Sequence, residues 1–143
     1  MNTAKQVAEF FLVLNSYEED ERLTNLKIQK LVYYAQGHHL GLYDKSLFNE
    51  PIIAWLHGPV VESLYFEFKQ NGAEGIPVPQ NFDPSVFDHN QIDLLNEIYM
   101  VYGQYSAWKL RNMTHNERPW METRKNREIS PKILRSYFKD LIA

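Results

Sequence analysis

Residues 23–43 read LTNLKIQKLVYYAQGHHLGLY, and their pattern predicts the long helix that decides the fold. Thr24 is a side chain that can cap the free N–H groups of a helix start. Leu23 and Ile28 are placed as a hydrophobic staple around that cap. Apolar side chains then recur at the spacing of one helix face, at Ile28, Leu31, Val32 and Ala35. We expect this helix to end near residues 43–44.

The same spacing predicts helices elsewhere in the chain. Residues 3–14 carry one apolar face, and the acidic run 18–21 that follows indicates a solvated turn. Gly58–Pro59 is placed to open another helix, with proline in its first turn. That helix should end at Asn71–Gly72, where glycine can take a left-handed conformation. Three later helix starts are expected at capping side chains, namely Asn90, Ser106 and Ser130.

A small β element is also expected. Residues 52–56 (IIAWL) are β-prone and lie between turn-forming residues. Residues 76–78 can lie beside them as an edge strand, since proline is tolerated at sheet edges. The sequence therefore predicts a mainly α, compact single domain spanning residues 1–143. We expect a bundle of about five or six helices with at most a small two-stranded β element.

The composition excludes several classes of function. The 143 residues contain no cysteine, which rules out disulfides, thiolate metal sites and cysteine nucleophiles. No window approaches about 18 unbroken apolar residues, and the N-terminus lacks the shape of a secretory signal. We therefore expect a cytoplasmic protein without a membrane span. The net charge of -3 weighs against a nucleic-acid partner.

The chain has no recognisable catalytic, metal or cofactor motif. Its five histidines lack the spacing of a zinc helix, and there is neither a Gly-x-Ser-x-Gly elbow nor a phosphate-binding glycine loop. We predict no catalytic residue, no metal and no cofactor. His115 and Glu117 lie close together, so a hydrolase that uses them is kept as a less favoured alternative. By elimination, the residues favour a binding module.

Three stretches, taken together, resemble the Panacea domain. They are residues 23–37 (LTNLKIQKLVYYAQG), residues 47–61 (LFNEPIIAWLHGPVV) and residues 114–120 (THNERPW). In this order and spacing the resemblance extends over about residues 5–140. It implies a mainly helical domain and the antitoxin half of a two-gene toxin–antitoxin or phage-defence module.

The resemblance also implies how such a protein works. Members of this family usually neutralise a cognate toxin, encoded by a neighbouring gene, through direct protein–protein contact. One branch instead delivers its toxin to a protease, so a proteolytic adaptor or phage regulatory protein is the main alternative. A DNA-binding repressor is disfavoured by the charge.

One face of the long helix is the expected partner-binding surface. Lys27 and Lys30 are three residues apart and share that face, and Tyr34 extends it by another turn. Cations and aromatic residues are common at interface hot spots. Lys27 and Lys30 are either ordinary solvated charges or a basic contact for an acidic toxin surface. On the second interpretation, Lys27, Lys30 and Tyr34 form an exposed stripe that contacts the toxin.

The remaining motif residues are expected to serve the structure. They are Thr24, Leu31, Trp55, Gly58, Pro59, His115 and Trp120. His57, His115 and Glu117 are expected to form a buried polar network, which would fix the fold rather than do chemistry.

Overall fold

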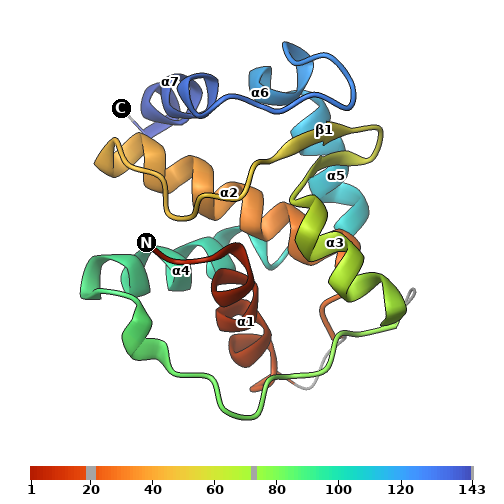
Figure 1. Cartoon of the computed structure of the whole chain (residues 1–143), viewed down its shortest axis with the longest axis vertical. Helices are drawn as coiled ribbons and strands as arrows, with labels where there is room; N and C mark the ends of the chain where they lie inside the picture. Colours follow the sequence, from red (N-terminus) through yellow and green to blue (C-terminus); the bar gives the residue numbers. More distant parts are fainter. Residues whose placement is uncertain (19–21, 72–73, 143) are drawn as a thin grey trace.

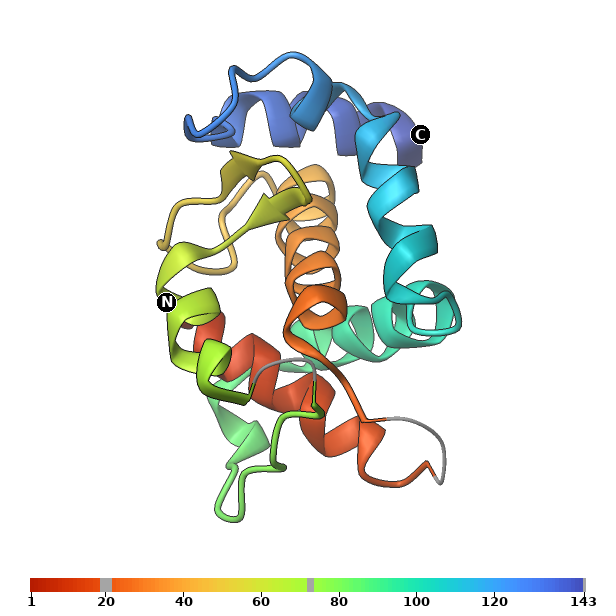
Figure 2. The ribbon, with the colours of Figure 1, turned by 90° about the vertical axis from the view of Figure 1, so that its right-hand side faces the viewer.

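Helix α2 (Asn25–Tyr43) is the central element of the fold. The computed structural model describes residues 1–18, 22–71 and 74–142 of the chain. Figures 1 and 2 show α2 crossing the middle of the molecule, with α7 (Pro131–Ile142) above it and α1 (Ala4–Asn15) and α4 (His89–Tyr102) below. Helix α5 (Ala107–His115) lies along its side. Most of α2 is buried, so it forms the axis of one core, and the predicted mainly α fold is confirmed.

The predicted start and end of α2 are confirmed. Thr24 Oγ1 accepts a hydrogen bond from the Lys27 N–H at 3.3 Å, which satisfies one of the free donors of the helix start. Leu23 and Ile28 are both buried, as a hydrophobic staple requires. After the last turn, Asp44 adopts a left-handed backbone with φ 58°, which ends the helix.

Two glycines of α2 let α7 cross it closely. A Cβ at Gly41 would lie 2.8 Å from the carbonyl carbon of Phe138, and a Cβ at Gly37 would overlap the Phe138 ring. The Phe138 side chain is consequently fully buried, and its ring packs edge-on against Tyr33 and Tyr34. These glycines, which weaken a helix locally, are therefore what allows α2 and α7 to pack together.

The β element is a hairpin that lies between α2 and the start of α3. Strand β1 (Ile53–Trp55) pairs antiparallel with β2 (Gly58–Val60). The Ala54 N–H also donates to the Arg127 carbonyl at 2.9 Å, so β1 contacts the segment that precedes α7. The predicted strand within residues 52–56 is confirmed, and this hairpin is the only sheet in the part of the chain that the structure describes.

The expectation that Gly58–Pro59 begins a helix is wrong. Both residues lie in β2, and α3 (Glu62–Phe68) begins only after Val61. The physical reason is the backbone at Gly58, whose φ of 113° lies far outside the helical region.

The connections differ from expectation in further ways. Residues 76–78 do not pair with β1, because the Ile76 N–H donates to the Leu23 carbonyl at 2.9 Å instead. A four-residue helix, α6 (Arg118–Met121), follows α5, so the described residues form seven α-helices rather than five or six. Two short 3-10 helices follow α3, at Lys69–Asn71 and Pro84–Val86. Most of the acidic run 18–21 and Gly72, the expected helix end, lie outside the described residues.

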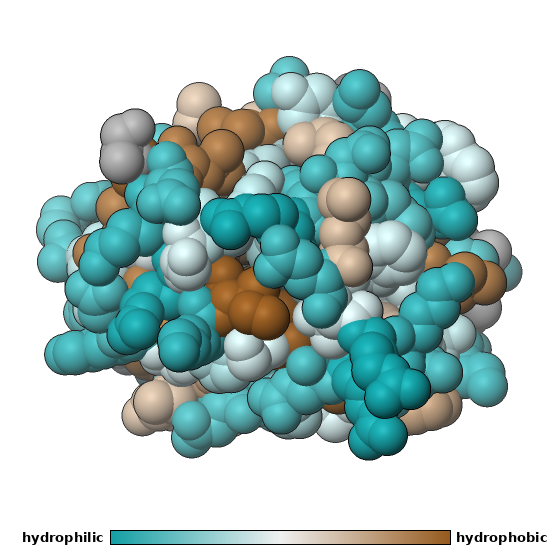
Figure 3. Space-filling model, turned by 90° about the horizontal axis from the view of Figure 1, so that it is seen from above, coloured by the Kyte–Doolittle hydropathy of each residue, from teal (hydrophilic) through white to brown (hydrophobic). Residues whose placement is uncertain are grey.

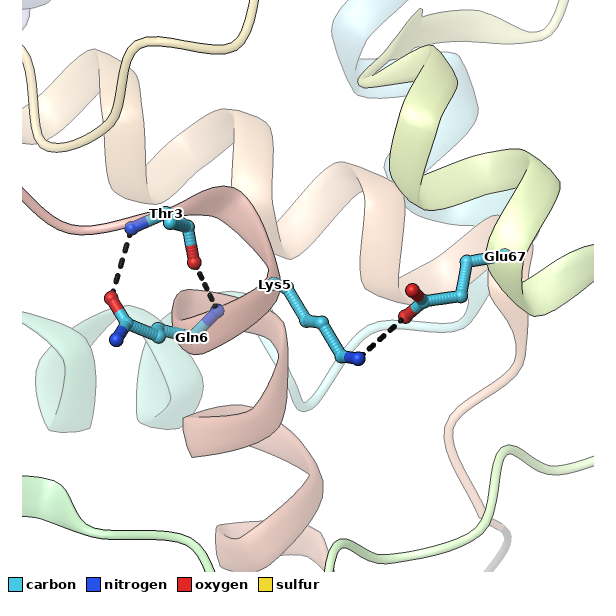
Figure 4. Close-up of polar contacts among 4 residues, drawn as sticks. All are labelled: Thr3, Lys5, Gln6 and Glu67. Carbon is cyan, nitrogen blue, oxygen red and sulfur yellow. Dashed lines mark hydrogen bonds and ion pairs between the residues drawn. The ribbon is translucent and has the colours of Figure 1, made fainter.

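Helix α1 is held at its start and along its side (Figure 4). Thr3 Oγ1 accepts from the Gln6 N–H at 3.1 Å, and the Gln6 side-chain oxygen accepts from the Thr3 N–H at 3.0 Å. This reciprocal pair is a capping box. In the same first turn, Lys5 forms an ion pair with Glu67 at 3.4 Å, which joins α1 to α3.

The later helix starts are mostly as predicted. Ser106 caps α5 through the Lys109 N–H, and Ser130 Oγ accepts a hydrogen bond from a backbone N–H in the first turn of α7. Helix α4 is the exception, because Asp88 rather than Asn90 is its cap. Asp88 accepts from the Gln91 N–H at 2.8 Å, and Asn90 lies inside the helix.

The outer surface is mixed. Figure 3 shows that the side seen from above, over α6 and α7, is largely hydrophilic, with apolar side chains gathered in separate patches. Within the described ranges, no helix combines the length and the apolar character needed to cross a bilayer.

Candidate partner-binding site

Two polar faces meet where α2 packs against α5. The residues of α2 lie three and four positions apart, on one face of the helix. They face the C-terminal half of α5 and the segment just after it, and Figure 2 shows the two helices side by side. The set, which we call the α2–α5 seam, consists of Lys30, Tyr33, Tyr34, Arg111, Thr114 and Glu117.

Glu117 is the acceptor of the seam. Its two carboxylate oxygens accept hydrogen bonds from the Tyr33 hydroxyl at 2.9 Å and the Tyr34 hydroxyl at 2.8 Å. Burial raises the pKa of Glu117 to about 7, although the two phenol donors act in the opposite direction. Burial and the adjacent carboxylate also raise the pKa of both tyrosines well above their ordinary value. The two tyrosines therefore stay neutral donors and fix the carboxyl group in place.

Lys30 is a buried cation without a hydrogen-bond partner. Its side chain is 0% exposed, and its Nζ has no partner among the described residues. Burial lowers the pKa of Lys30 to about 7, and the nearby Arg111 charge lowers it further. An amine in this position costs stability, because its charged form has lost water and gained no counter-charge.

Gly58 of the hairpin covers the Lys30 side chain. A Cβ at Gly58 would lie 2.6 Å from Lys30 Cε and 3.0 Å from Thr114 Oγ1. Gly58 also has the positive φ that side-chain-bearing residues rarely adopt. Both facts explain why glycine stands at this point of the hairpin.

His115 and Trp120 join α5 and α6 to the hairpin. The His115 ring nitrogens lie 2.7 Å from the Leu56 carbonyl oxygen and 2.6 Å from the Arg111 carbonyl oxygen. The Trp120 indole N–H donates to the Trp55 carbonyl at 2.8 Å, and the His115 and Trp120 rings are 4.0 Å apart.

The expected network of His57, His115 and Glu117 is therefore wrong. His115 contacts backbone carbonyls, Glu117 contacts tyrosines, and His57 is exposed at the turn of the hairpin. In the described ranges, no three histidine or carboxylate side chains come together as a group that could hold a metal ion.

A hollow with aromatic walls opens beside the seam. It has a volume of about 520 Å³ and lies between the start of α2, the hairpin, α3 and α5. We call it the aromatic groove, and its lining consists of Asn25, Leu26, Gln29, Trp55, His57, Val60, Tyr65, Lys69, Trp108 and Arg111. The Trp108 side chain is 63% exposed, and the Arg111 guanidinium lies 4.7 Å from its ring centre. Trp55 and Tyr65 pack edge-on with ring centres 4.8 Å apart.

The family of the chain follows from comparison with known proteins. A family model described as antitoxin SocA-like, Panacea domain, matches residues 28–121, well over half of the chain. The chain belongs to the Panacea family. The matched part runs from α2 to α6 and so includes the whole α2–α5 seam and most of the aromatic groove. No curated protein and no solved structure matches the chain.

The Panacea motif residues have clear positions in this structure. Thr24 caps α2, Leu31 is fully buried, and Trp55 is half-buried in β1. Gly58 and Pro59 shape β2 over Lys30, although they were expected at a helix start.

The expected exposed stripe on α2 is wrong for two of its three residues. Lys30 and Tyr34 are each 0% exposed, because Gly58 of the hairpin lies over Lys30, while Tyr102 of α4 and Phe138 of α7 pack on Tyr34. Lys27 is partly exposed, and its Nζ donates to the Gly103 carbonyl at 2.7 Å. These three side chains therefore do not form one accessible surface on this Panacea domain.

The aromatic groove is the surface that the sequence did not indicate. Trp108 carried a signal, since it lies on a different face of α5 from the buried Leu110 and Thr114. A large aromatic residue on the polar face of an amphipathic helix is unusual and points outward. Tyr65 and Arg111 gave no comparable signal, because only the fold brings them beside Trp108.

Proposed function

We propose that this Panacea domain is an antitoxin that neutralises a toxin, encoded by a neighbouring gene, by binding it directly. The observation that carries the proposal is the match of residues 28–121 to an antitoxin-like family. The proposal extends that family character to a cognate toxin and to inhibition by contact.

We further propose that the aromatic groove is the surface that contacts the toxin. Its walls hold Trp55, Tyr65, Trp108 and Arg111, the residue types that dominate interface hot spots. Phe66 and Leu56 next to it are 59% and 56% exposed, which extends the apolar area beyond the groove itself. A protein contact of ordinary size covers about 800 Å² on each partner, so the groove would form its centre.

The groove is also held in shape before any partner arrives. The Trp55 indole N–H donates to Glu62 at 2.9 Å, and the Trp55 carbonyl accepts from Trp120. Arg111 is held against the Trp108 ring. A surface whose side chains are already ordered loses less entropy on binding, which favours a stable complex.

Co-expression with the neighbouring gene tests the proposal. The neighbouring product is expressed alone and with the Panacea domain, growth is followed, and the complex is isolated through a tag on one partner. We expect toxicity alone and rescue with a stable complex. Rescue accompanied by loss of the toxin protein indicates the adaptor alternative, and a harmless neighbour without a complex contradicts the proposal.

Two matched variants test whether the toxin contacts the aromatic groove. Trp108→Ala removes an exposed aromatic side chain from the groove, and Tyr17→Ala removes one that is 83% exposed elsewhere. We expect the first to abolish rescue and the second to retain it. Equal rescue by both variants would show that the toxin binds another surface.

A further inference from the structure

We propose that the aromatic groove takes an acidic segment of the partner protein, with a carboxylate on Arg111 and an apolar side chain against Trp108 and Trp55. This inference rests on the proposed function and specifies the chemistry of the partner.

The groove is cationic in a protein whose net charge is -3. Its lining includes Lys69 and Arg111 and no aspartate or glutamate. The nearby Glu62 carboxylate is engaged by the Trp55 indole N–H at 2.9 Å. A positive lining of this kind attracts a negatively charged segment and disfavours a basic one.

Arg111, which lines the groove, and Lys30, in the adjacent seam, each have a side-chain nitrogen without a hydrogen-bond partner among the described residues. These atoms, Arg111 Nε and Lys30 Nζ, are both buried. The one side-chain bond of Arg111 that the structure shows runs from Nη1 to Asn112 Oδ1 at 3.3 Å. Arginine stays charged at all relevant pH values. Its charge and that of Lys30 repel each other, so together they favour an added anion.

Glu117, a carboxylate of the same protein, does not pair with Arg111 or Lys30. Glu117 lies in the same seam, but its oxygens accept from Tyr33 and Tyr34, and it forms no ion pair with Lys30 or Arg111. A buried charge that has no partner destabilises a fold, and a counter-charge relieves that cost. Among the described residues Arg111 has no carboxylate partner, so a carboxylate of a partner protein is the counter-charge that we assign to it.

The walls of the groove favour a peptide segment over a small anion. The Arg111 guanidinium lies over the Trp108 ring, 4.7 Å from its centre, and a guanidinium suits two-point recognition of a carboxylate. Trp55, Val60 and Tyr65 form the apolar remainder of a hollow of about 520 Å³, which is room for one or two side chains. An acidic residue next to a large apolar one on the toxin fits both features.

The test measures the dissociation constant between the Panacea domain and the neighbouring-gene toxin. Arg111→Gln removes the charge, Arg111→Lys keeps it, and Lys109→Gln is the control, since Lys109 is an exposed cation of the same helix outside the groove. We expect Arg111→Gln to weaken binding roughly 30-fold or more, because it leaves the partner carboxylate unpaired. Arg111→Lys should weaken it less, and Lys109→Gln should leave it within about twofold, as expected of an exposed charge outside the contact.

A scan of the toxin then identifies the carboxylate. Each acidic residue of the toxin is changed to its amide, alone and together with Arg111→Gln. One position should lose its effect when Arg111 is already changed, with a coupling of tenfold or more. A complex that forms with full affinity in Arg111→Gln and Arg111→Lys overturns this inference but leaves the antitoxin proposal standing. The absence of any complex with the native chain removes both.

Two other outcomes also overturn the inference. If the complex dissociates on nuclease treatment, the groove binds nucleic acid rather than an acidic protein segment. If Trp108→Ala changes the sedimentation of the Panacea domain alone from dimer to monomer, a second copy of the chain is the occupant.

Discussion

Replacement of Lys30 by methionine should make this protein more stable. Methionine matches the length of the lysine stem but carries no charge. The pKa of Lys30 is lowered from 10.5 to about 7, which at pH 7 corresponds to about 4 kcal/mol of cost, at about 1.4 kcal/mol per tenfold change in proton affinity. Because the side chain is 0% exposed, solvent does not screen this cost. Lys30→Met should therefore raise the free energy of unfolding by about 2–4 kcal/mol at pH 7.

The pH dependence identifies the cause. The folded chain disfavours the charged amine, so the penalty is fully present below pH 7, where Lys30 is protonated in both states. It shrinks as the pH rises from 7 towards 10.5, because the folded amine is then neutral and the free energy of removing its proton falls with each unit of pH. The stability advantage of methionine should therefore be about 3 kcal/mol larger at pH 6 than at pH 9.5.

Urea unfolding at pH 6 and pH 9.5 measures this difference. The native chain, Lys30→Met and Lys109→Met are compared, and the exposed Lys109 serves as the control that should change little. A methionine variant that is less stable at pH 6, or an advantage that is equal at both pH values, would refute the reasoning.

Three further changes probe the seam and the helix that carries it, each followed by urea unfolding. Burial raises the pKa of Glu117 from 4.5 to about 7, so the free energy of unfolding should fall as the pH rises from 4.5 to 7. Glu117→Gln should remove up to about 3 kcal/mol of this pH dependence of stability. An unchanged pH profile of stability would contradict the assignment. Gly58→Ala should cost about 2 kcal/mol or more, because its Cβ would lie 2.6 Å from Lys30 Cε at a positive φ, and the cost should fall in the Lys30→Ala background. Thr24→Ala should cost about 1 kcal/mol through loss of the α2 cap, and Thr24→Ser should restore most of it.

The fold was largely predictable because its main signals are local. The α2 cap at Thr24 and the apolar spacing after it depend only on neighbouring residues, and the structure shows both. The prediction of a helix start at Gly58–Pro59 was wrong, because the same dipeptide can either start a helix or lie in a strand. The choice is made by Lys30 and Thr114, which pack beneath Gly58 and come from distant parts of the chain.

The candidate site was less predictable for the same reason. Lys30 and Tyr34 share a face of α2, but whether that face is open depends on the hairpin, α4 and α7, which come from distant parts of the chain and cover it. Helical spacing shows which residues lie together and not what packs on them. The aromatic groove gathers side chains from four elements, so only Trp108, with its outward position on α5, could have been noticed from the sequence.

The most direct test of the central claim is the affinity of the purified toxin for the native Panacea domain, Trp108→Ala and Tyr17→Ala, measured by calorimetry under one set of conditions. Loss of a central aromatic anchor typically costs 2 kcal/mol or more, so Trp108→Ala should bind roughly 30-fold more weakly while Tyr17→Ala binds like the native chain. Equal affinity of all three proteins, or no binding by the native chain, would contradict the account.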